Sequence, residues 1–167
     1  TTNDTVSVNQ YGHSLFIHGN DGNNLIWFGQ FPDGDIAILG LSDGNAQTTL
    51  NDNSTTFGRY SGVKNIFINT FGGNDLVVGT NNIFALHYCL DFDIIPKLKF
   101  GLPEDLANDI YIPGELEIVT GDGYDVVALG GIGTQYNMEV FSGNDADLVG
   151  FCDIYAGANL LAVTGSG

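Results

Sequence analysis

Residues 116–137 read "LEIVTGDGYDVVALGGIGTQYN" and are followed at once by residues 138–159, "MEVFSGNDADLVGFCDIYAGAN". The two stretches align without a gap, and residues 160–167 begin a third copy. The matching pairs are Glu117 with Glu139, Gly121 with Gly143, Asp125 with Asp147, Val127 with Val149, Ile132 with Ile154 and Asn137 with Asn159. The repeating unit is an alternating strand, a turn rich in Gly, Asp and Asn, and a second alternating strand that opens with Asp.

Earlier parts of the chain carry weaker copies of the same unit. The stretches "LFIHGNDGNNLIWFGQ" and "INTFGGNDLVVG" align with it and place Asn24 and Asp75 in the column of Asp125. The first residues, "TTNDTVSV", match only the second half of the unit and place Asp4 in that column. The spacing between copies varies, but an Asp or Asn keeps its position in each of them.

The alternation of apolar and polar residues, together with the turn residues, predicts an all-β protein. A repeat of about 22 residues is typical of a parallel β-helix, or β-solenoid, whose equivalent strands pair about 4.8 Å apart. We therefore expect Ile118, Val140 and Ala162 to stack on one another, and Val127 to stack on Val149. A β-sandwich is the alternative, although it explains an ungapped repeat less well.

We expect one domain over residues 1–167, with an irregular insertion at residues 90–115 that holds three of the four prolines. Within the insertion, "PEDLAND" predicts a short helical turn and "NDIYI" a strand. Residues 41–60 are polar and predict a long turn, and "GDIAILG" at 34–40 predicts a further strand.

The chain is strongly acidic, with 20 acidic and four basic residues and a net charge of −16. This charge excludes nucleic acid and anionic membranes as partners and favours cations. Eleven Phe and seven Tyr indicate a folded core rather than disorder, and no apolar run is long enough for membrane insertion. Residue 1 is not Met and no signal peptide is present, so we expect a mature or excised product. Cys89 and Cys152 allow either a disulfide or two buried thiols.

The column of aspartates predicts bound Ca²⁺, because stacked carboxylates repel one another and calcium takes six to eight oxygen ligands. Glycines in the same turns allow the backbone to fold around an ion. The candidate ligands are Asp4, Asp21, Asn23, Asn74, Asp75, Asp122, Asp125, Asn144, Asp145 and Asp147. The alternative needs no metal: Asp and Asn at turns often accept hydrogen bonds from the backbone amides of their own turn.

The stretches "GGNDLVV", "TGDGYDVVALG" and "SGNDADLVG" resemble the Gly-Asn-Asp-rich repeats of β-helix proteins secreted by bacteria. They are more distantly similar to the calcium-binding nonapeptide repeats of the RTX family, and Gly121 to Val127 fit part of that pattern. RTX repeats follow one another every nine residues, whereas this chain has one such turn in each unit. The resemblance therefore implies a secreted, calcium-binding β-solenoid, but no particular set of ligands.

These observations predict a non-catalytic, extracellular or cell-surface structural or adhesive protein. The last residues, "LLAVTGSG", and the first, "TTNDTVSV", are complementary halves of one unit. We therefore expect copies of the chain to assemble end to end into a filament, or the unit to neighbour further repeats of a longer chain.

The alternative function is a polysaccharide-active lyase or hydrolase on a β-helix scaffold. The chain has one Arg and three Lys, none beside an Asp cluster in a repeat strand, so a basic catalytic residue is not indicated. A groove with paired acids outside the repeat columns would favour this alternative. The insertion offers four acids for such a groove, namely Asp91, Asp93, Glu104 and Asp105.

Overall fold

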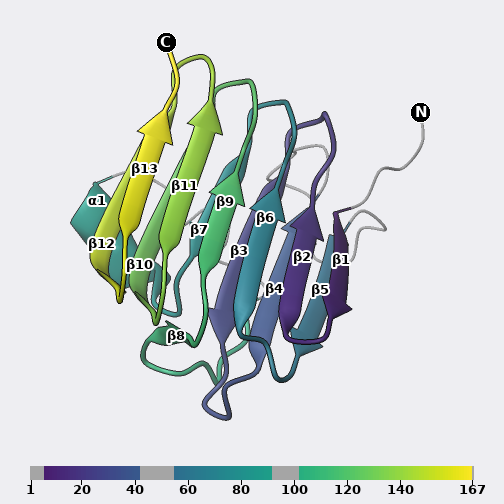
Figure 1. Ribbon diagram of the computed structural model, residues 1–167, viewed down its shortest axis with the longest axis vertical. Coiled ribbons are helices and arrows are strands. Elements are labelled where there is room, and N and C mark those ends of the chain that lie inside the picture. Colours follow the sequence, from purple (N-terminus) through teal and green to yellow (C-terminus); the bar gives the residue numbers. More distant parts are fainter. Residues whose placement is uncertain (1–5, 42–54, 92–101, 167) are drawn as a thin grey trace.

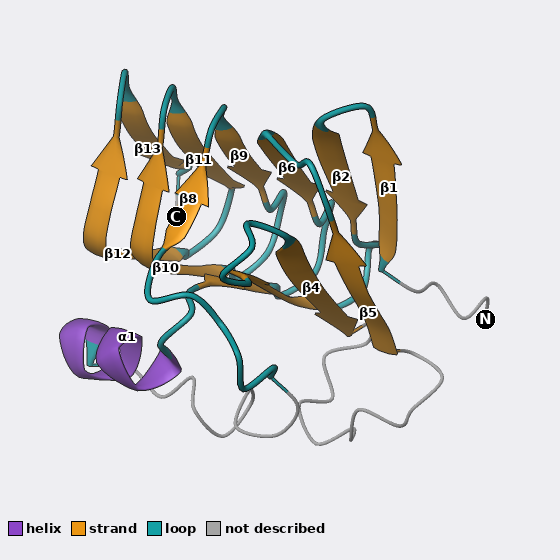
Figure 2. Cartoon of the chain, turned by 90° about the horizontal axis from the view of Figure 1, so that it is seen from below, coloured by secondary structure: helices purple, strands orange, loops and turns teal. Residues whose placement is uncertain are grey.

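Two β-sheets lie face to face in the computed structural model, which describes residues 6–41, 55–91 and 102–166 (Figures 1 and 2). The first sheet has the strand order β1-β2-β6-β9-β11-β13. The second has the order β12-β10-β7-β3-β4-β5, and β8 pairs with β10 beside this path.

The bounds of the strands are as follows. The first sheet contains β1 (Ser7–Tyr11), β2 (Ser14–His18), β6 (Asn65–Asn69), β9 (Leu116–Val119), β11 (Met138–Gly143) and β13 (Leu160–Thr164). The second contains β3 (Leu25–Gln30), β4 (Ile36–Leu41), β5 (Thr55–Tyr60), β7 (Leu76–Gly79), β8 (Ile110–Ile112), β10 (Val126–Thr134) and β12 (Leu148–Ala156).

The repeat fixes the pairing of the parallel strands. From β9 onward the chain alternates between the sheets, so that equivalent strands become neighbours (Figure 1). Val140 pairs with Ile118 on one side and with Ala162 on the other, as expected. Val127 pairs with Val149, and the same register continues along β10 and β12. We call two strands that follow one another along the chain, one in each sheet, a row; β9 with β10 and β11 with β12 are examples.

The prediction of a parallel β-helix with coils of about 22 residues is wrong. The strands form two mixed sheets in which parallel pairs predominate, but β1–β2, β3–β4 and β4–β5 are antiparallel. Tight turns reverse the chain between β1 and β2 and between β3 and β4. Gly12 and Gly34 have φ of 59° and 93°, a left-handed conformation that glycine adopts without steric cost. The N–H of Gly34 donates to the carbonyl of Phe31 and closes the turn between β3 and β4.

An ion-pair cluster holds the antiparallel strands β3, β4 and β5 together. Arg59 on β5 forms salt bridges with Asp33 and Asp35 in the turn between β3 and β4. Its guanidinium also lies 4.1 Å from the ring centroid of Phe31. These contacts raise the pKa of Arg59, chiefly through the hydrogen bond to Asp35. Arg59 thus links β5 to the turn between β3 and β4, in addition to the backbone pairing of β5 with β4.

Several predictions for the irregular segments can now be compared with the structure. The expected strand in "GDIAILG" is β4, and the expected strand in "NDIYI" is β8. The long polar turn predicted at 41–60 is wrong over its last residues, which form β5, and its centre lies outside the described residues. "PEDLAND" forms no helix. Instead a helix, α1 (Ile83–Leu90), begins before the predicted insertion.

Helix α1 packs on the outer face of the second sheet (Figure 2). Its side chains Ile83 and Leu86 are buried against a second apolar cluster that includes Trp27 and Ala128. The side chain of Asn82 caps the helix by accepting the N–H of Ala85. Among the described residues, no helix is long and apolar enough to cross a membrane.

A disulfide bond joins α1 to β12. Cys89 on the helix is bonded to Cys152 on the strand, 63 residues later, so the question that the sequence left open is resolved in favour of a disulfide. Closing a loop of this length stabilises a fold by roughly 4 kcal/mol in the chain-entropy account. The bond therefore fastens the helix to the last strand of the second sheet.

The main core lies between the sheets. Side chains from the first sheet, among them Ile17, Ile118 and Val140, pack against Phe28 and Leu129 of the second, and all five are inaccessible to solvent. Inward-facing side chains alternate with outward-facing ones along β9 and β11, as expected for strands with one face on a core. Hydrophobic burial between the sheets is thus the main stabilising term.

A column of glycines lets the turns of successive rows approach closely. A Cβ on Gly121 would lie 1.3 Å from the carbonyl oxygen of Phe71, and a Cβ on Gly143 would lie 1.6 Å from that of Gly121. A Cβ on Gly165 would meet the carbonyl oxygen of Gly143 at the same distance. The repeat therefore needs glycine here because backbone of the preceding row occupies the space of a side chain.

Replacing a glycine of this column should destabilise the protein more than its backbone conformation alone explains. Gly143→Ala adds a clash with backbone to the strain of φ 81°, whereas Gly34→Ala has φ 93° but no atom within 4 Å of the new Cβ. We expect Gly34→Ala to cost about 1–2 kcal/mol. Gly143→Ala should cost at least about 2 kcal/mol more. Urea unfolding of both variants measures the difference, and equal losses would contradict the close contact between rows.

Candidate functional site

The predicted aspartate column exists, and its residues are buried except for Asp147, which is half-buried. Asn24, Asp75, Asp125 and Asp147 each stand just before a strand of the second sheet, at the starts of β3, β7, β10 and β12. Asn24 and Asp75 are each 2% exposed and Asp125 is fully buried. Because these strands are parallel neighbours, their first residues meet along one edge of the sheet.

Side chains and backbone amides of this column form a continuous ladder. The N–H of Asn24 donates to Oδ1 of Asp75 at 2.7 Å. The N–H of Asp75 donates to Oδ1 of Asp125 at 2.8 Å, and the N–H of Asp125 donates to Oδ1 of Asp147 at 3.1 Å. Each carboxylate thus accepts the backbone amide of the equivalent residue in the preceding row. We call this set of three bonds the aspartate ladder.

The ladder differs from the turn-capping alternative in which backbone amide each aspartate accepts. An aspartate in an ordinary turn accepts an amide of its own turn, whereas these accept an amide of another row. The bonds therefore add to the backbone bonds between neighbouring rows, in which the N–H groups of Leu76, Val126 and Leu148 donate to the carbonyls of Asn24, Asp75 and Asp125. A charged acceptor makes each bond stronger than a neutral one, by about twofold.

A second column, of hydroxyl groups, lies beside the ladder. The hydroxyl of Thr70 donates to the carbonyl of Thr120, and that of Thr120 donates to the carbonyl of Ser142. The hydroxyl of Ser142 instead donates to Oδ2 of Asp147 at 2.7 Å. Asp147 therefore has both oxygens bonded.

Three oxygens in the ladder have no donor. They are Oδ1 of Asn24, Oδ2 of Asp75 and Oδ2 of Asp125, all of them buried. For the two aspartates, the single proton of the nearby threonine hydroxyl explains this: while Thr70 or Thr120 donates it to a carbonyl of the next row, it cannot also donate it to the carboxylate. Buried acceptors without a donor disfavour the charged form of a carboxyl group.

Burial raises the pKa of Asp75 from 3.8 to about 6. Hydrogen bonds from Thr70 and Asn24 oppose this rise in pKa, and Thr70 makes its bond when its proton turns towards the carboxylate. The charge of Asp125 adds to the rise. Burial likewise raises the pKa of Asp125, with a further rise from the charges of Asp147 and Asp122. The two central carboxyl groups are therefore held in the native state at an electrostatic cost.

The other predicted ligands lie in the outer part of the turns and bond mainly to one another. The N–H of Asn74 donates to Oδ1 of Asn23 at 2.7 Å, and the side chain of Asn144 donates to Oδ1 of Asp122 at 2.8 Å. Asp21 and Asp145 are exposed, and Asp145 has φ of 83°. Asp4 lies outside the described residues.

Calcium remains a prediction. Within residues 6–41, 55–91 and 102–166, no three His, Cys, Asp or Glu side chains come together in a way that could hold a metal ion. The ladder also gives the aspartates a role without an ion, since each uses Oδ1 to accept an amide. The donorless oxygens of Asp75 and Asp125 are the atoms to which an ion would bind.

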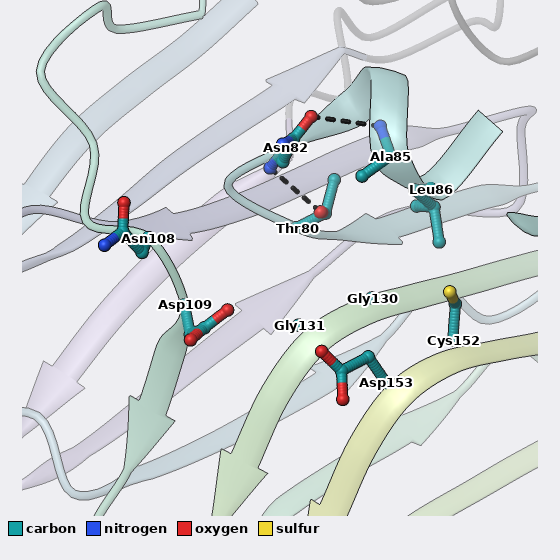
Figure 3. Close-up of a pocket in the computed structure, with 10 residues that line it drawn as sticks. All are labelled: Thr80, Asn82, Ala85, Leu86, Asn108, Asp109, Gly130, Gly131, Cys152 and Asp153. Atoms are coloured by element: carbon teal, nitrogen blue, oxygen red, sulfur yellow. Dashed lines mark hydrogen bonds between the residues drawn. The ribbon is translucent and has the colours of Figure 1, made fainter. Parts of the chain in front are cut away.

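A groove on the outer face of the second sheet is the second candidate site, and the sequence did not predict it. It runs across β8, β10 and β12 and holds about 350 Å³. We call it the tyrosine groove and define it by Asp109, Tyr111, Gly131, Gly133, Asp153 and Tyr155. A smaller hollow of about 120 Å³ adjoins it beneath α1 and shares Asp109, Gly131 and Asp153 with it (Figure 3).

The groove is built from three residues in each of two columns. Gly133 on β10 pairs with Tyr111 on β8 and with Tyr155 on β12, so a glycine lies between two tyrosines. Asp109 and Asp153 also lie on either side of Gly131, although neither is paired with it in the strand register (Figure 3). The glycines leave the middle strand without side chains, while the flanking strands supply walls.

No family model, curated protein or solved structure matches this chain. Its possible functions must therefore be inferred from its own geometry.

The repeat itself contained the signal for the groove. Residues 109, 131 and 153 are separated by the repeat length, and so are residues 111, 133 and 155. An insertion at 90–115, as predicted from the sequence, separates β8 from the repeat, whereas the structure places β8 one row before β10. Extending the alignment upstream from Gly133 would have placed Tyr111 beside it.

The aspartate ladder predicts an unusual pH dependence of stability. A carboxyl group whose native pKa is raised binds its proton more tightly when folded, so the free energy of unfolding should fall as pH rises from about 4 to 6. Asp75→Asn should remove most of this fall, which amounts to roughly 3 kcal/mol, and should stabilise the protein at pH 7. Asn24 already occupies the equivalent position in the neighbouring row.

Urea unfolding in EDTA between pH 4 and pH 7 tests this, with Asp105→Asn as the matched control, because Asp105 is exposed and lies outside the ladder, so its slope should equal that of the wild type. The same titration in calcium chloride tests the predicted ion. Calcium on the ladder would reverse the slope, because it binds the ionised carboxylates. A fall in Asp75→Asn as steep as that of the wild type would contradict the assignment.

Proposed function

We propose that this protein is a non-catalytic, extracellular structural or adhesive module that associates with a second copy of itself through strand β13. The disulfide between Cys89 and Cys152 supports an extracellular site, because such bonds persist in oxidising compartments. The observation that carries the proposal is the state of β13, an edge strand with an apolar, uncharged and exposed surface.

The two ends of the sheets differ in how well they cover the core. At the end formed by β1, β4 and β5, the core residues Val6, Leu15 and Ile38 are almost completely buried. At the opposite end, Leu160 is 49% exposed and Val163 is 43% exposed. Apolar residues on an edge strand favour pairing with another strand.

The backbone of β13 is also suited to strand addition. In the preceding rows, the N–H of Leu116 donates to the carbonyl of Asn137, and that of Met138 donates to the carbonyl of Asn159. By the same geometry the N–H of Leu160 points away from β11, towards the position of a further strand. β-Strand addition uses such edge groups to bind a partner.

Charge favours a second copy as that partner. The chain has a net charge of −16, yet residues 154–167 contain no Asp, Glu, Lys or Arg. Edge strands in soluble proteins commonly carry a charge that prevents pairing, and β13 has none. Two acidic molecules can therefore approach each other most closely at this end.

The expected contact is two-fold rather than head to tail. A filament needs two complementary open ends, and the sequence predicted them from matching halves of one unit. However, β1, the edge strand of the same sheet at the first end, is antiparallel to β2, so this edge does not continue the parallel register of β13. A contact between the two uncovered ends closes on itself as a dimer.

A polysaccharide-active enzyme is the second candidate, and the facing carboxyl groups of Asp109 and Asp153 favour it. A lyase would need a basic residue, but no Arg or Lys is among the described residues of the groove. Of the insertion acids named from the sequence, Asp91, Glu104 and Asp105 do not line it, and Asp93 lies outside the described residues. Release of new reducing ends from a polysaccharide would favour this candidate.

A charge placed on β13 should prevent dimer formation without unfolding the chain. Leu161→Lys puts an ammonium group opposite Glu139, its partner across the strands, so the single chain gains an opposite-charge pair. In a two-fold contact, the two ammonium groups would repel each other. Light scattering after gel filtration should give twice the 17.8 kDa of one chain for the wild type and one chain for the variant.

The matched control is Tyr136→Lys, which adds the same charge at an exposed residue in the turn before β11 and should leave the dimer intact. A monomeric wild type at every concentration would contradict the proposal. A dimer that persists in Leu161→Lys would show that another surface makes the contact.

A further inference from the structure

The floor of the tyrosine groove is kept open by glycine. Gly133 lies in the middle strand β10, flanked by strands that carry a tyrosine at the paired position. A Cβ on Gly133 would lie 3.6 Å from Cδ2 of Tyr111, which is an ordinary contact, and its φ is not positive. Neither close packing nor backbone conformation therefore requires glycine here. The absence of a side chain creates the space.

Two tyrosines form the walls of this space. Tyr111 is 52% exposed and Tyr155 is 67% exposed, although both are large aromatic residues on regular strands. Strands β8 and β12 are two strand spacings apart, or about 9–10 Å. A six-membered ring in contact with an aromatic face on each side, at about 4 Å per contact, needs roughly 8 Å. The groove is therefore wide enough for one ring between its walls.

Polar groups lie at one end of the walls. Asp109 and Asp153 face each other across Gly131, and both line the groove and the adjoining hollow. Asn82 and Asn108 also line that hollow (Figure 3). Carboxylates accept hydrogen bonds, while amide groups can both accept and donate. A ligand with several hydroxyl groups can use all of these partners.

The charge of the groove selects among ring-shaped ligands. Its described lining contains two carboxyl groups and no Arg or Lys. An acidic sugar would be repelled here, and a simple ammonium ion could not accept hydrogen bonds from the amides. A sugar without acidic groups presents C–H bonds to the electron-rich faces of the tyrosines and hydroxyl groups to the polar end.

We propose that the tyrosine groove binds a pyranose ring of a non-acidic carbohydrate, held between Tyr111 and Tyr155 with its hydroxyl groups towards Asp109 and Asp153. This inference rests on the proposed function in one respect: it gives the adhesive role a target. The groove is formed within one chain, on the outer face of the second sheet, and not by the edge of β13.

Isothermal titration calorimetry of the full chain tests the proposal with cellohexaose, laminarihexaose and chitohexaose as probes. At least one of these neutral hexasaccharides should bind saturably. Tyr155→Ala removes one wall, and Gly133→Val fills the floor with a residue that favours strands. Each should weaken binding by about tenfold or more. Tyr155→Phe should retain binding, because the aromatic wall remains.

Tyr136→Ala is the matched control, because Tyr136 is 56% exposed but lies outside the groove, and it should bind like the wild type. Unchanged urea midpoints establish that Gly133→Val and Tyr155→Ala remain folded. The proposal is overturned if none of the three hexasaccharides binds, or if binding survives both groove variants. Binding of oligogalacturonate or tetramethylammonium in their place also overturns it.

The same titration on Leu161→Lys separates the two proposals. If the variant is monomeric and still binds the hexasaccharide, the groove acts independently of dimer formation. A wild type that never dimerises but binds the sugar would refute the association at β13 alone. A dimer that binds no hexasaccharide would refute the groove alone.

Discussion

The structure depends on a hydrogen bond between the backbone amide of one row and a buried carboxylate of the next. Asn24, Asp75 and Asp125 each donate an N–H to the aspartate of the following row. An amide buried without an acceptor and a carboxylate buried without a donor would each be costly, and the ladder pairs them. The pairing is incomplete, because Oδ2 of Asp75 and of Asp125 has no donor. Strong attachment between rows is thus obtained together with a raised pKa of Asp75.

The ladder also fixes the register on which the other features depend. A slip of one residue would move every inward side chain of β10 and β12 to the outer face. It would also move the glycines away from the carbonyl oxygens that they contact in the preceding row. The same register places Gly133 between Tyr111 and Tyr155. The groove therefore results from the same alignment of rows that builds the core. It forms where one outward-facing column holds tyrosine, glycine and tyrosine in successive rows.

The pairing of the later rows could be predicted from the sequence, because an ungapped repeat implies that equivalent residues are neighbours. The aspartate column could be predicted for the same reason. The overall fold could not, since the chain reverses at Gly12 between β1 and β2 and at Gly34 between β3 and β4, and such short turns leave no mark on the repeat pattern. Nor could the direction of the ladder be foreseen. Whether an aspartate accepts an amide of its own turn or of the next row depends on the distance between rows, which composition does not show.

Amide hydrogen exchange measured residue by residue by NMR at neutral pH tests the ladder most directly. The N–H groups of Asp75 and Asp125 stand in turns, before their strands begin, yet the account predicts protection as strong as that of the core amides of β10. The N–H of Asp35, which donates within its own turn to Oδ1 of Asp33, should exchange far faster. Exchange of the Asp75 and Asp125 amides at the rate of Asp35 would contradict the claim that these carboxylates join the rows.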